Sequence, residues 1–211
     1  MRAGIELERL LSRYGYEAES ECARKFRIYL DLLEKWNRRI NLVSSTSWKI
    51  LGPLLEEGLW ASRFYPEGAV RHLDIGSGAG FPALPMRLVK RDMQLRLIES
   101  REKRAVFLET AADTLGLAGT RVSNRTVEAY LESEGSEGGW ECVSWKAIRL
   151  EGRTISSLVK KATRGASFWM FHGEQLPVEE GELDSSLRLV SRETMPGKPS
   201  WHLSIFEKSP R

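Results

Sequence analysis

The chain has 211 residues, of which 41% are hydrophobic and 29% charged, and its formal net charge is +3 at pH 7. This length suits one α/β domain with a short accessory segment, and the composition excludes an intrinsically disordered chain. No apolar run approaches the roughly 18 residues of a membrane span, and the N-terminus lacks an apolar signal segment, so we expect a cytoplasmic protein. Cys22 and Cys142 lack metal-ligand spacing, so we expect neither a disulfide framework nor a metal site.

Basic residues gather in three groups along the chain. They are Arg24, Lys25 and Arg27, then Lys35, Arg38 and Arg39, and then Arg101, Lys103 and Arg104. Such groups permit a polyanionic partner, but charge by itself favours the plainer interpretation of solvated helix faces.

The first sixty-odd residues are predicted to be helical because apolar residues recur at steps of three and four. One apolar stripe covers residues 26–40, a shorter one covers residues 7–14, and a third covers residues 54–64 after Pro53. Helices without intervening strands predict a small helical cap over residues 1–66.

The rest of the chain, residues 67–211, is predicted to be a Rossmann-like α/β domain, because short apolar strands alternate with helices. Strands are expected at residues 70–75, 95–98, 120–123, 140–145 and 167–171, with helices at 81–89, 103–115 and 155–162. Two late strands, 187–191 and 201–207, predict a closing hairpin and bring the mostly parallel sheet to seven strands. A flexible loop is expected at residues 132–139, which offer almost nothing to bury.

A glycine-rich segment, DIGSGAGFP at residues 74–82, follows the first strand of this domain and opens its first helix. Glycines such as Gly76 and Gly78 let the backbone turn sharply and approach a ligand closely. A dinucleotide loop has the order G-x-G-x-x-G, whereas this loop reads G-x-G-x-G after an acidic residue. Asp74 suits the cationic methionine part of a sulfonium cofactor and would repel a pyrophosphate.

A second acidic residue, Glu99, closes the next predicted strand, 25 residues after Asp74. At that place a carboxylate can accept hydrogen bonds from both ribose hydroxyls of a nucleoside. A tight turn and a solvated strand end explain either feature by itself, but the two features together favour S-adenosylmethionine. NAD stays as the alternative, because both cofactor classes use a strand, a glycine turn and an acidic residue.

Three segments carry a more specific pattern: LLEKWNRRINL at residues 32–42, LDIGSGAGFP at residues 73–82, and SREKRAVFL at residues 100–108. They resemble the bacterial 16S ribosomal RNA guanine-N7 methyltransferases, once called glucose-inhibited division protein B. The resemblance implies a monomeric Rossmann-like enzyme that uses S-adenosylmethionine, with 16S rRNA or the small ribosomal subunit as its partner. It also implies cofactor contacts, which would come from Gly76, Phe81, Glu99, Val127 and Glu128.

The substrate side departs from the family pattern at three places. The family's His-x-x-Asp-Ser is LLEEG at residues 54–58, its arginine after strand four is Lys146, and its Lys-Gly is His172-Gly173. These departures keep two alternatives open, a catalytically impaired homologue that binds cofactor or RNA, and a methyltransferase with another nucleic acid target. We expect Lys146 to contact cofactor and substrate, since it closes a parallel strand at the ligand-binding edge.

Guanine N7 has an exposed lone pair in the neutral base, so methyl transfer needs positioning rather than a general base, and no catalytic residue is assigned. His172 and Trp145 are candidates for substrate binding at the strand ends. Trp145 and Phe171 could stack on a splayed-out base, although packing in the sheet core explains them equally well. Glu57 could stabilise a cationic purine, but we interpret it as part of a solvated helix face.

Overall fold

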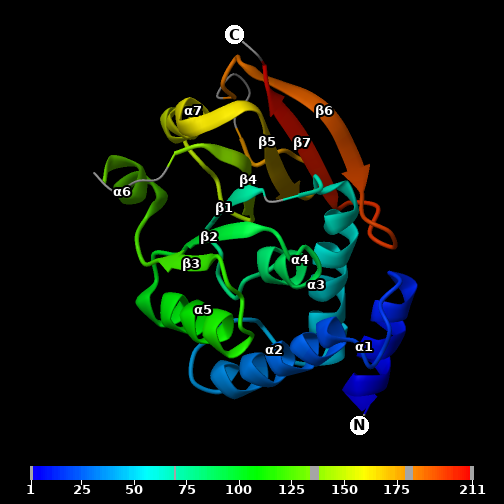
Figure 1. Cartoon of the computed structure of the whole chain (residues 1–211). Coiled ribbons are helices and arrows are strands. Elements are labelled where there is room, and N and C mark those ends of the chain that lie inside the picture. Colours follow the sequence, from blue (N-terminus) through cyan, green and yellow to red (C-terminus); the bar gives the residue numbers. More distant parts are fainter. Residues whose placement is uncertain (1, 69, 134–137, 179–182, 210–211) are drawn as a thin grey trace.

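The centre of the protein is a twisted sheet, which Figure 1 shows in a computed structural model that describes residues 2–68, 70–133, 138–178 and 183–209. The strands found there are β1 (Arg71–Ile75), β2 (Gln94–Ile98), β3 (Thr120–Ser123), β4 (Trp140–Lys146), β5 (Ala162–His172), β6 (Leu187–Thr194) and β7 (His202–Lys208). Their spatial order is β3-β2-β1-β4-β5-β7-β6. The strands from β1 to β5 are parallel, and β7 is antiparallel to both β5 and β6. The predicted seven-stranded, mostly parallel sheet with a closing hairpin is confirmed.

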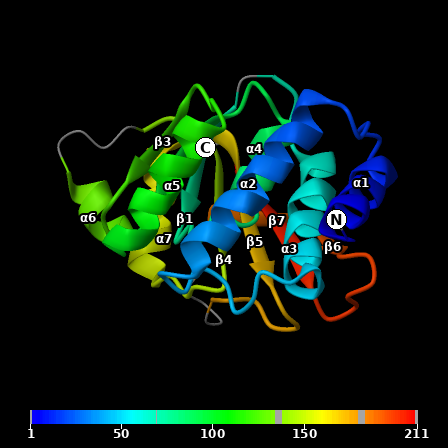
Figure 2. The same cartoon turned by 90° about the horizontal axis from the view of Figure 1, so that it is seen from below.

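Helices cover both faces of this sheet. They are α1 (Arg2–Arg13), α2 (Glu21–Asn37), α3 (Trp48–Ala61), the 3-10 helix η1 (Ser62–Phe64), α4 (Ala83–Val89), α5 (Glu102–Thr114), α6 (Val127–Glu132) and α7 (Gly152–Lys161). Figure 2 looks at the face on which α2, α3 and α5 lie in front of the sheet. Buried side chains of α1 to α5 form one hydrophobic cluster with this face, and those of α6 and α7 form a second cluster with the opposite face.

The N-terminal helices follow the predicted apolar stripes, with two differences at their ends. The stripe predicted to reach Ile40 breaks earlier, because the Asn37 side chain accepts hydrogen bonds from the amides of Leu42 and Val43 and turns the chain. The third helix was expected after Pro53, but α3 already begins at Trp48 and contains this proline. A proline inside a helix removes one hydrogen bond and crowds the carbonyl four residues earlier, and here the helix residues buried on both sides of Pro53 offset this cost.

The core domain also differs from the prediction in its details. The helix α4 begins at Ala83 rather than at residue 81. Periodicity did not predict α6, because six residues are too few to show a helical stripe; its signal is Thr126, whose hydroxyl accepts a hydrogen bond from the amide of Ala129. Of the predicted loop 132–139, residues 134–137 lie outside the described residues. β5 begins at Ala162, which was expected to close a helix.

Alternation along β1 decides which side chains meet the N-terminal helices. Leu73 and Ile75 belong to the cluster under α6 and α7, so His72 and Asp74 point to the face that α1 to α5 cover. Because residues of α1 to α3 and of the sheet share one cluster, the N-terminal segment and the α/β domain are packed together. The boundary between residues 66 and 67 stays a prediction.

Candidate functional site

The glycine-rich loop lies at the carboxyl edge of the parallel strands. It follows β1, which has β2 on one side and β4 on the other, so the order of the strands changes direction at β1. Loops diverge at such a switch point, and ligands of open α/β sheets bind there. The amides of Gly76 and Ser77 donate to the carbonyl of Ile98 at 2.9 and 3.1 Å, and the Tyr29 hydroxyl donates to the carbonyl of Ala79 at 2.6 Å. Strand β2 and helix α2 therefore hold the loop in place.

The three glycines of the loop are required for different reasons. A Cβ atom at Gly80 would lie 2.5 Å from Cδ1 of Leu84, and one at Gly76 would lie 3.0 Å from Cδ1 of Ile148. At Gly78, which has a φ of +59°, the nearest atom to such a Cβ is 3.8 Å away. Packing within the protein explains Gly80 and Gly76, whereas a Cβ atom at half-buried Gly78 would make only ordinary contacts, with Nη1 of Arg104 and the carbonyl of Gly76. The positive φ of Gly78 therefore requires the glycine, which leaves this part of the loop backbone without a side chain between it and a ligand.

Glu99 joins the end of β2 to this loop. Its carboxylate is 5% exposed and accepts hydrogen bonds from the amide of Gly78 at 2.8 Å and from the amide of Arg101 at 2.9 Å. A carboxylate offers about four lone-pair sites, so both oxygens can accept a further donor. The structure therefore brings together the two landmarks that the sequence predicted, and leaves acceptor capacity for the hydroxyls of a ribose.

Asp74 ends a buried chain of hydrogen bonds on the face under the N-terminal helices. The Ser144 hydroxyl donates to Oδ1 of Asp74 at 2.6 Å and lies 2.7 Å from Nε2 of His72, whose Nδ1 lies 3.1 Å from the Tyr65 hydroxyl. Since Ser144 donates its one proton to Asp74, the bonding pattern assigns the ring hydrogen of His72 to Nε2. The sequence analysis had no role for Ser144 or Tyr65, because only the sheet register brings them to Asp74.

Burial changes the protonation chemistry of this chain. It raises the pKa of Asp74 to about 6, although the hydrogen bonds from Ser144 and Ser77 and the charge of Lys146 lower that pKa. Burial also lowers the pKa of His72 to about 3. At neutral pH the pair is therefore an ionised carboxylate and an uncharged imidazole. A buried negative charge beside the loop suits a cationic ligand.

Lys146, at the end of β4, meets a carboxylate of α3. Glu57 is 2% exposed, and its Oε2 forms an ion pair with the Lys146 ammonium. Its Oε1 accepts a hydrogen bond from Nε1 of Trp201 at 2.5 Å, and the Lys146 ammonium lies 5.5 Å from the centre of the Trp201 ring. Our interpretation of Glu57 as a solvated helix face is wrong, because this side of α3 packs against the sheet edge. The sequence analysis missed Trp201, which is 144 residues away from Glu57 in the chain.

The remaining substrate candidates lie inside the protein. Trp145 and Phe171 have no exposed surface, so in this structure neither ring can stack on a base, and the alternative of core packing is confirmed. His172 is 3% exposed; its Nδ1 lies 2.6 Å from the carbonyl oxygen of Gly173 and its Nε2 lies 2.9 Å from the hydroxyl of Ser204. Burial lowers the pKa of His172. Both ring nitrogens are already engaged, so His172 supports the sheet edge from within.

Three cofactor contacts implied by the family resemblance have different surroundings. The ring of Phe81 is buried and lies 5.5 Å from the ring of Tyr29, so it packs under the loop. Val127 is buried at the start of α6, whereas Glu128 is exposed and accepts a hydrogen bond from the Thr154 hydroxyl at 3.2 Å. Val127 and Glu128 follow β3, which neighbours β2, and thus lie beyond Glu99 along the same sheet edge.

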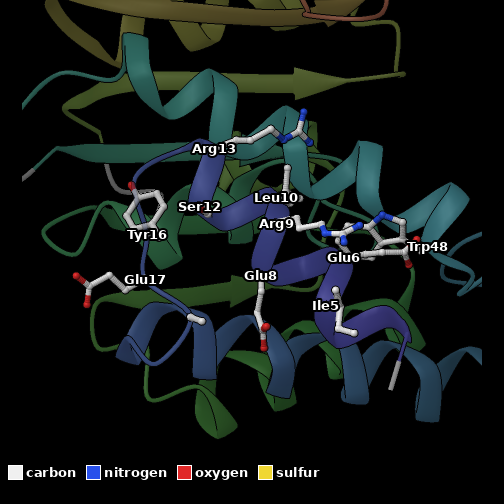
Figure 3. Close-up of a pocket in the computed structure, with 11 residues that line it drawn as sticks. Ile5, Glu6, Glu8, Arg9, Leu10, Ser12, Arg13, Tyr16, Glu17 and Trp48 are labelled. Carbon is white, nitrogen blue, oxygen red and sulfur yellow. The ribbon is translucent and has the colours of Figure 1, made fainter.

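Two large hollows lie away from the loop. One, of about 780 Å³, lies beside α1 and is lined by both acidic and basic side chains, among them Glu6, Glu8, Arg9 and Arg13 (Figure 3). The other, of about 790 Å³, lies between α2 and α5. Within the described ranges, no cluster of three potential metal ligands occurs, and no helix is both long and apolar enough to cross a membrane.

Solved structures that share this fold include S-adenosylmethionine-dependent methyltransferases. A SAM-dependent methyltransferase from Aquifex aeolicus matches with a TM-score of 0.54 at 13% identity, over 74% of this chain and 90% of that chain. TrmN from Thermus thermophilus matches with a TM-score of 0.55 at 14% identity, over 74% of this chain and 48% of that chain. At these identities the likeness concerns the fold.

The family model of rRNA small subunit methyltransferase G, GidB, matches residues 22–195, and the chain belongs to this family. Ribosomal RNA small subunit methyltransferase G of Streptococcus equi subsp. equi is 30% identical over 148 residues, which cover 66% of this chain and 60% of that protein. The relative from Streptococcus pyogenes serotype M12 is 29% identical over 149 residues, with the same coverage. The chain thus spans about 60% of the length of the curated relatives that it matches, and the family resemblance seen in the sequence is confirmed.

Proposed function

We propose that this protein transfers a methyl group from S-adenosylmethionine to N7 of a guanine in 16S rRNA of the small ribosomal subunit. The observation that carries the proposal is the hydrogen bond from the Gly78 amide to the carboxylate of Glu99 at 2.8 Å, which joins the glycine-rich loop to the end of β2. It lies at the switch point of the sheet in a chain of the methyltransferase G family.

The residues around the loop are suited to the parts of this cofactor. Gly78 offers room for close approach, and Glu99 offers acceptors for the two ribose hydroxyls. The buried charge of Asp74 suits the cationic methionine end, and Val127 and Glu128 are our candidates for the adenine edge. When bound, S-adenosylmethionine supplies an electrophilic methyl group on a positively charged sulfur.

The reaction requires positioning more than proton transfer. The N7 lone pair forms the new bond to the methyl carbon as the carbon–sulfur bond breaks, and the bonding electron pair stays on sulfur. Correct positioning of two reactants can lower a barrier by about 7–11 kcal/mol. The purine becomes cationic, and the buried carboxylates of Asp74, Glu57 and Glu99 outnumber the cations of Lys146 and Arg104 at this edge. Such an environment stabilises positive charge that develops during transfer.

The hollow between α2 and α5 supports RNA as the partner. Lys35, Arg39 and Lys103 line it, and none of the three forms an ion pair with a residue in the described part of the chain. By contrast, Lys25, Arg27 and Arg38 of the same basic groups pair with nearby glutamates. Three unpaired cations thus line one hollow, where phosphates can bind beside the apolar lining.

Transfer of labelled methyl groups tests the proposal. The purified protein is incubated with labelled S-adenosylmethionine and small ribosomal subunits that lack N7-methylguanine, with naked 16S rRNA and large subunits in parallel. We expect label in 16S rRNA at an N7-methylguanine, which chemical cleavage at that base locates. Label in another nucleic acid would support the alternative target. Cofactor binding without transfer to any of these RNAs would support the catalytically impaired homologue and overturn the proposal.

A further inference from the structure

Trp201 lies at the same edge and on the same face of the sheet as Lys146. Lys146 pairs with Phe171 of β5, and Phe171 pairs with Leu203 of β7. Trp201 precedes Leu203 by two residues, so it shares the face of Leu203, and the antiparallel direction of β7 brings it to the carboxyl edge of β5. The pairing of Ile75 with Trp145 likewise brings Gly76 level with Lys146. Strands β4 and β5 lie between β7 and β1, but the indole lies against Lys146 at the end of β4, the strand that neighbours β1.

The orientation of this indole is fixed. Its Nε1 donates to Glu57, and the same carboxylate pairs with the ammonium of Lys146 beside the ring. Rotation of the ring would leave one oxygen of a 2% exposed carboxylate without its donor. Trp201 is thus a half-buried aromatic side chain that is held in place before any ligand binds.

Other aromatic side chains of this edge have little or no surface to offer. Trp145 and Phe171 are completely buried, and Phe81 is 9% exposed and packs against Tyr29. Trp201 is half-buried, so unlike these residues it keeps exposed surface. It is suited to the stacking contact that Trp145 and Phe171 were expected to make.

The charges next to the ring also suit a purine that becomes positively charged. Aromatic faces attract cations, and tryptophan does so most strongly. The ammonium of Lys146 by itself would oppose a second cation, but the Glu57 carboxylate neutralises it at contact distance. The three residues therefore present an aromatic surface with no net charge.

We propose that Trp201 is the platform on which the methyl-accepting purine stacks, and that Glu57 and Lys146 are positioning residues that hold its indole. This inference rests on the proposed function and adds a substrate-binding residue to it.

The test compares Trp201→Ala and Trp201→Phe with the parent protein. A lost stacking contact of about 1–3 kcal/mol corresponds to a fall of about 5- to 150-fold in kcat/KM for the RNA in Trp201→Ala. We expect Trp201→Phe to recover part of this loss, because phenylalanine keeps a stacking ring but cannot donate to Glu57. The Kd for S-adenosylmethionine should stay within about twofold of the parent value. The matched control is Trp48→Ala, which removes a half-buried tryptophan near α1 and should leave kcat/KM unchanged.

A second measurement makes the inference independent of turnover. Calorimetry with S-adenosylhomocysteine present measures the affinity for 7-methylguanosine monophosphate, which we expect Trp201→Ala to weaken at least fivefold. Equal affinity in the parent and Trp201→Ala, no binding to the parent, or a Trp201→Phe variant as impaired as Trp201→Ala would overturn the platform. A parent that binds this nucleotide through Trp201 but methylates no RNA would overturn the proposed function alone.

Discussion

The cofactor side and the substrate side of the candidate site are built in different ways. On the cofactor side, the contacts join backbone atoms of neighbouring elements, such as the amides of Gly76 and Ser77 to the carbonyl of Ile98. The side chains that join this arrangement also bind backbone atoms: Glu99 accepts from two amides, and the Tyr29 hydroxyl donates to the carbonyl of Ala79. On the substrate side, Glu57 and Lys146 contact Trp201 only through side chains.

This difference explains where the chain departs from its family. A backbone-built site keeps its glycines and its acidic residue, whereas a side-chain cluster can change if its members change together. Glu57 stands where the family pattern has aspartate and Lys146 where it has arginine, and these two departures form one ion pair. The side chain of Glu57 is longer than that of aspartate, and the side chain of Lys146 is shorter than that of arginine, so the two changes in length compensate each other. The third departure, His172, lies nearby, with its ring 5.7 Å from that of His202, next to Trp201.

The strongest test of the cofactor side is Gly78→Val. Valine is strained at a φ of +59°, and its branched side chain would stand between the loop backbone and the ligand, so we expect the Kd for S-adenosylmethionine to rise more than a hundredfold. Calorimetry measures this Kd. Gly116→Val is the matched control, because Gly116 has a φ of +58° and no atom within 4 Å of an added Cβ, but lies after α5. Equal loss of binding in both variants would attribute the effect to backbone strain and not to the loop surface.

The substrate side should respond most in stability. Lys146→Ala leaves the buried carboxylate of Glu57 without its cation, and loss of one partner of a buried ion pair costs about 3–5 kcal/mol. Urea unfolding of the parent, the single variant and Lys146→Ala combined with Glu57→Gln measures this cost. The double variant should recover part of the loss because it removes the unpaired charge. A single variant within about 1 kcal/mol of the parent would show that the pair contributes little in solution.

Glu99→Ala should have a smaller effect, and on binding rather than on folding. Hydrogen bonds to a charged group contribute about 1.5–3 kcal/mol, so we expect a 10- to 150-fold weaker Kd for S-adenosylmethionine. The Kd of Glu99→Asp should lie between those of the parent and Glu99→Ala, because the shorter side chain of aspartate reaches fewer of the hydrogen-bond donors. Glu109→Ala, an exposed change on α5, is the control. Binding by Glu99→Ala as tight as in the parent would transfer the ribose role to another residue.

The smallest effect is expected from the buried chain of hydrogen bonds that includes His72 and Asp74, between the two sides. This effect is a pH dependence of the free energy of unfolding. The pKa of His72 is lowered to about 3, so its contribution is complete above the unfolded value of 6.5 and is lost as the pH falls toward 3. The pKa of Asp74 is raised to about 6, so its contribution is complete below 3.8 and is lost as the pH rises through 6. The two contributions oppose each other between about pH 4 and pH 6.

His72→Gln separates these contributions. Without the imidazole, the variant does not lose the stability that the parent loses as the pH falls. The difference in unfolding free energy between the parent and the variant should therefore shrink by about 2 kcal/mol from pH 7.5 to pH 5. Urea unfolding at both pH values measures the gap, and its change with pH is informative even if the variant is less stable throughout. A gap that is the same at both pH values would show that His72 binds a proton equally well in the folded and unfolded protein.

The sequence by itself determined the layers of the fold and the places of the glycine-rich loop and of Glu99, the proposed cofactor side. Strands such as β1 and β2 are short apolar runs, and the loop and Glu99 follow them at once in the chain, so local patterns predict their positions. It also indicated the family, because the glycine loop and the segment at residues 32–42 are contiguous stretches of sequence.

Tertiary structure decided the substrate side. The residue type does not predict the burial of Glu57 or of Trp145, because the burial of each side chain depends on the element that packs against it. The pairing of β5 with β7 brings Trp201 to Lys146, and the packing of α3 on the sheet brings Glu57 to both. Contacts between side chains so distant in the chain leave no periodic or spacing signal, since no local pattern depends on them.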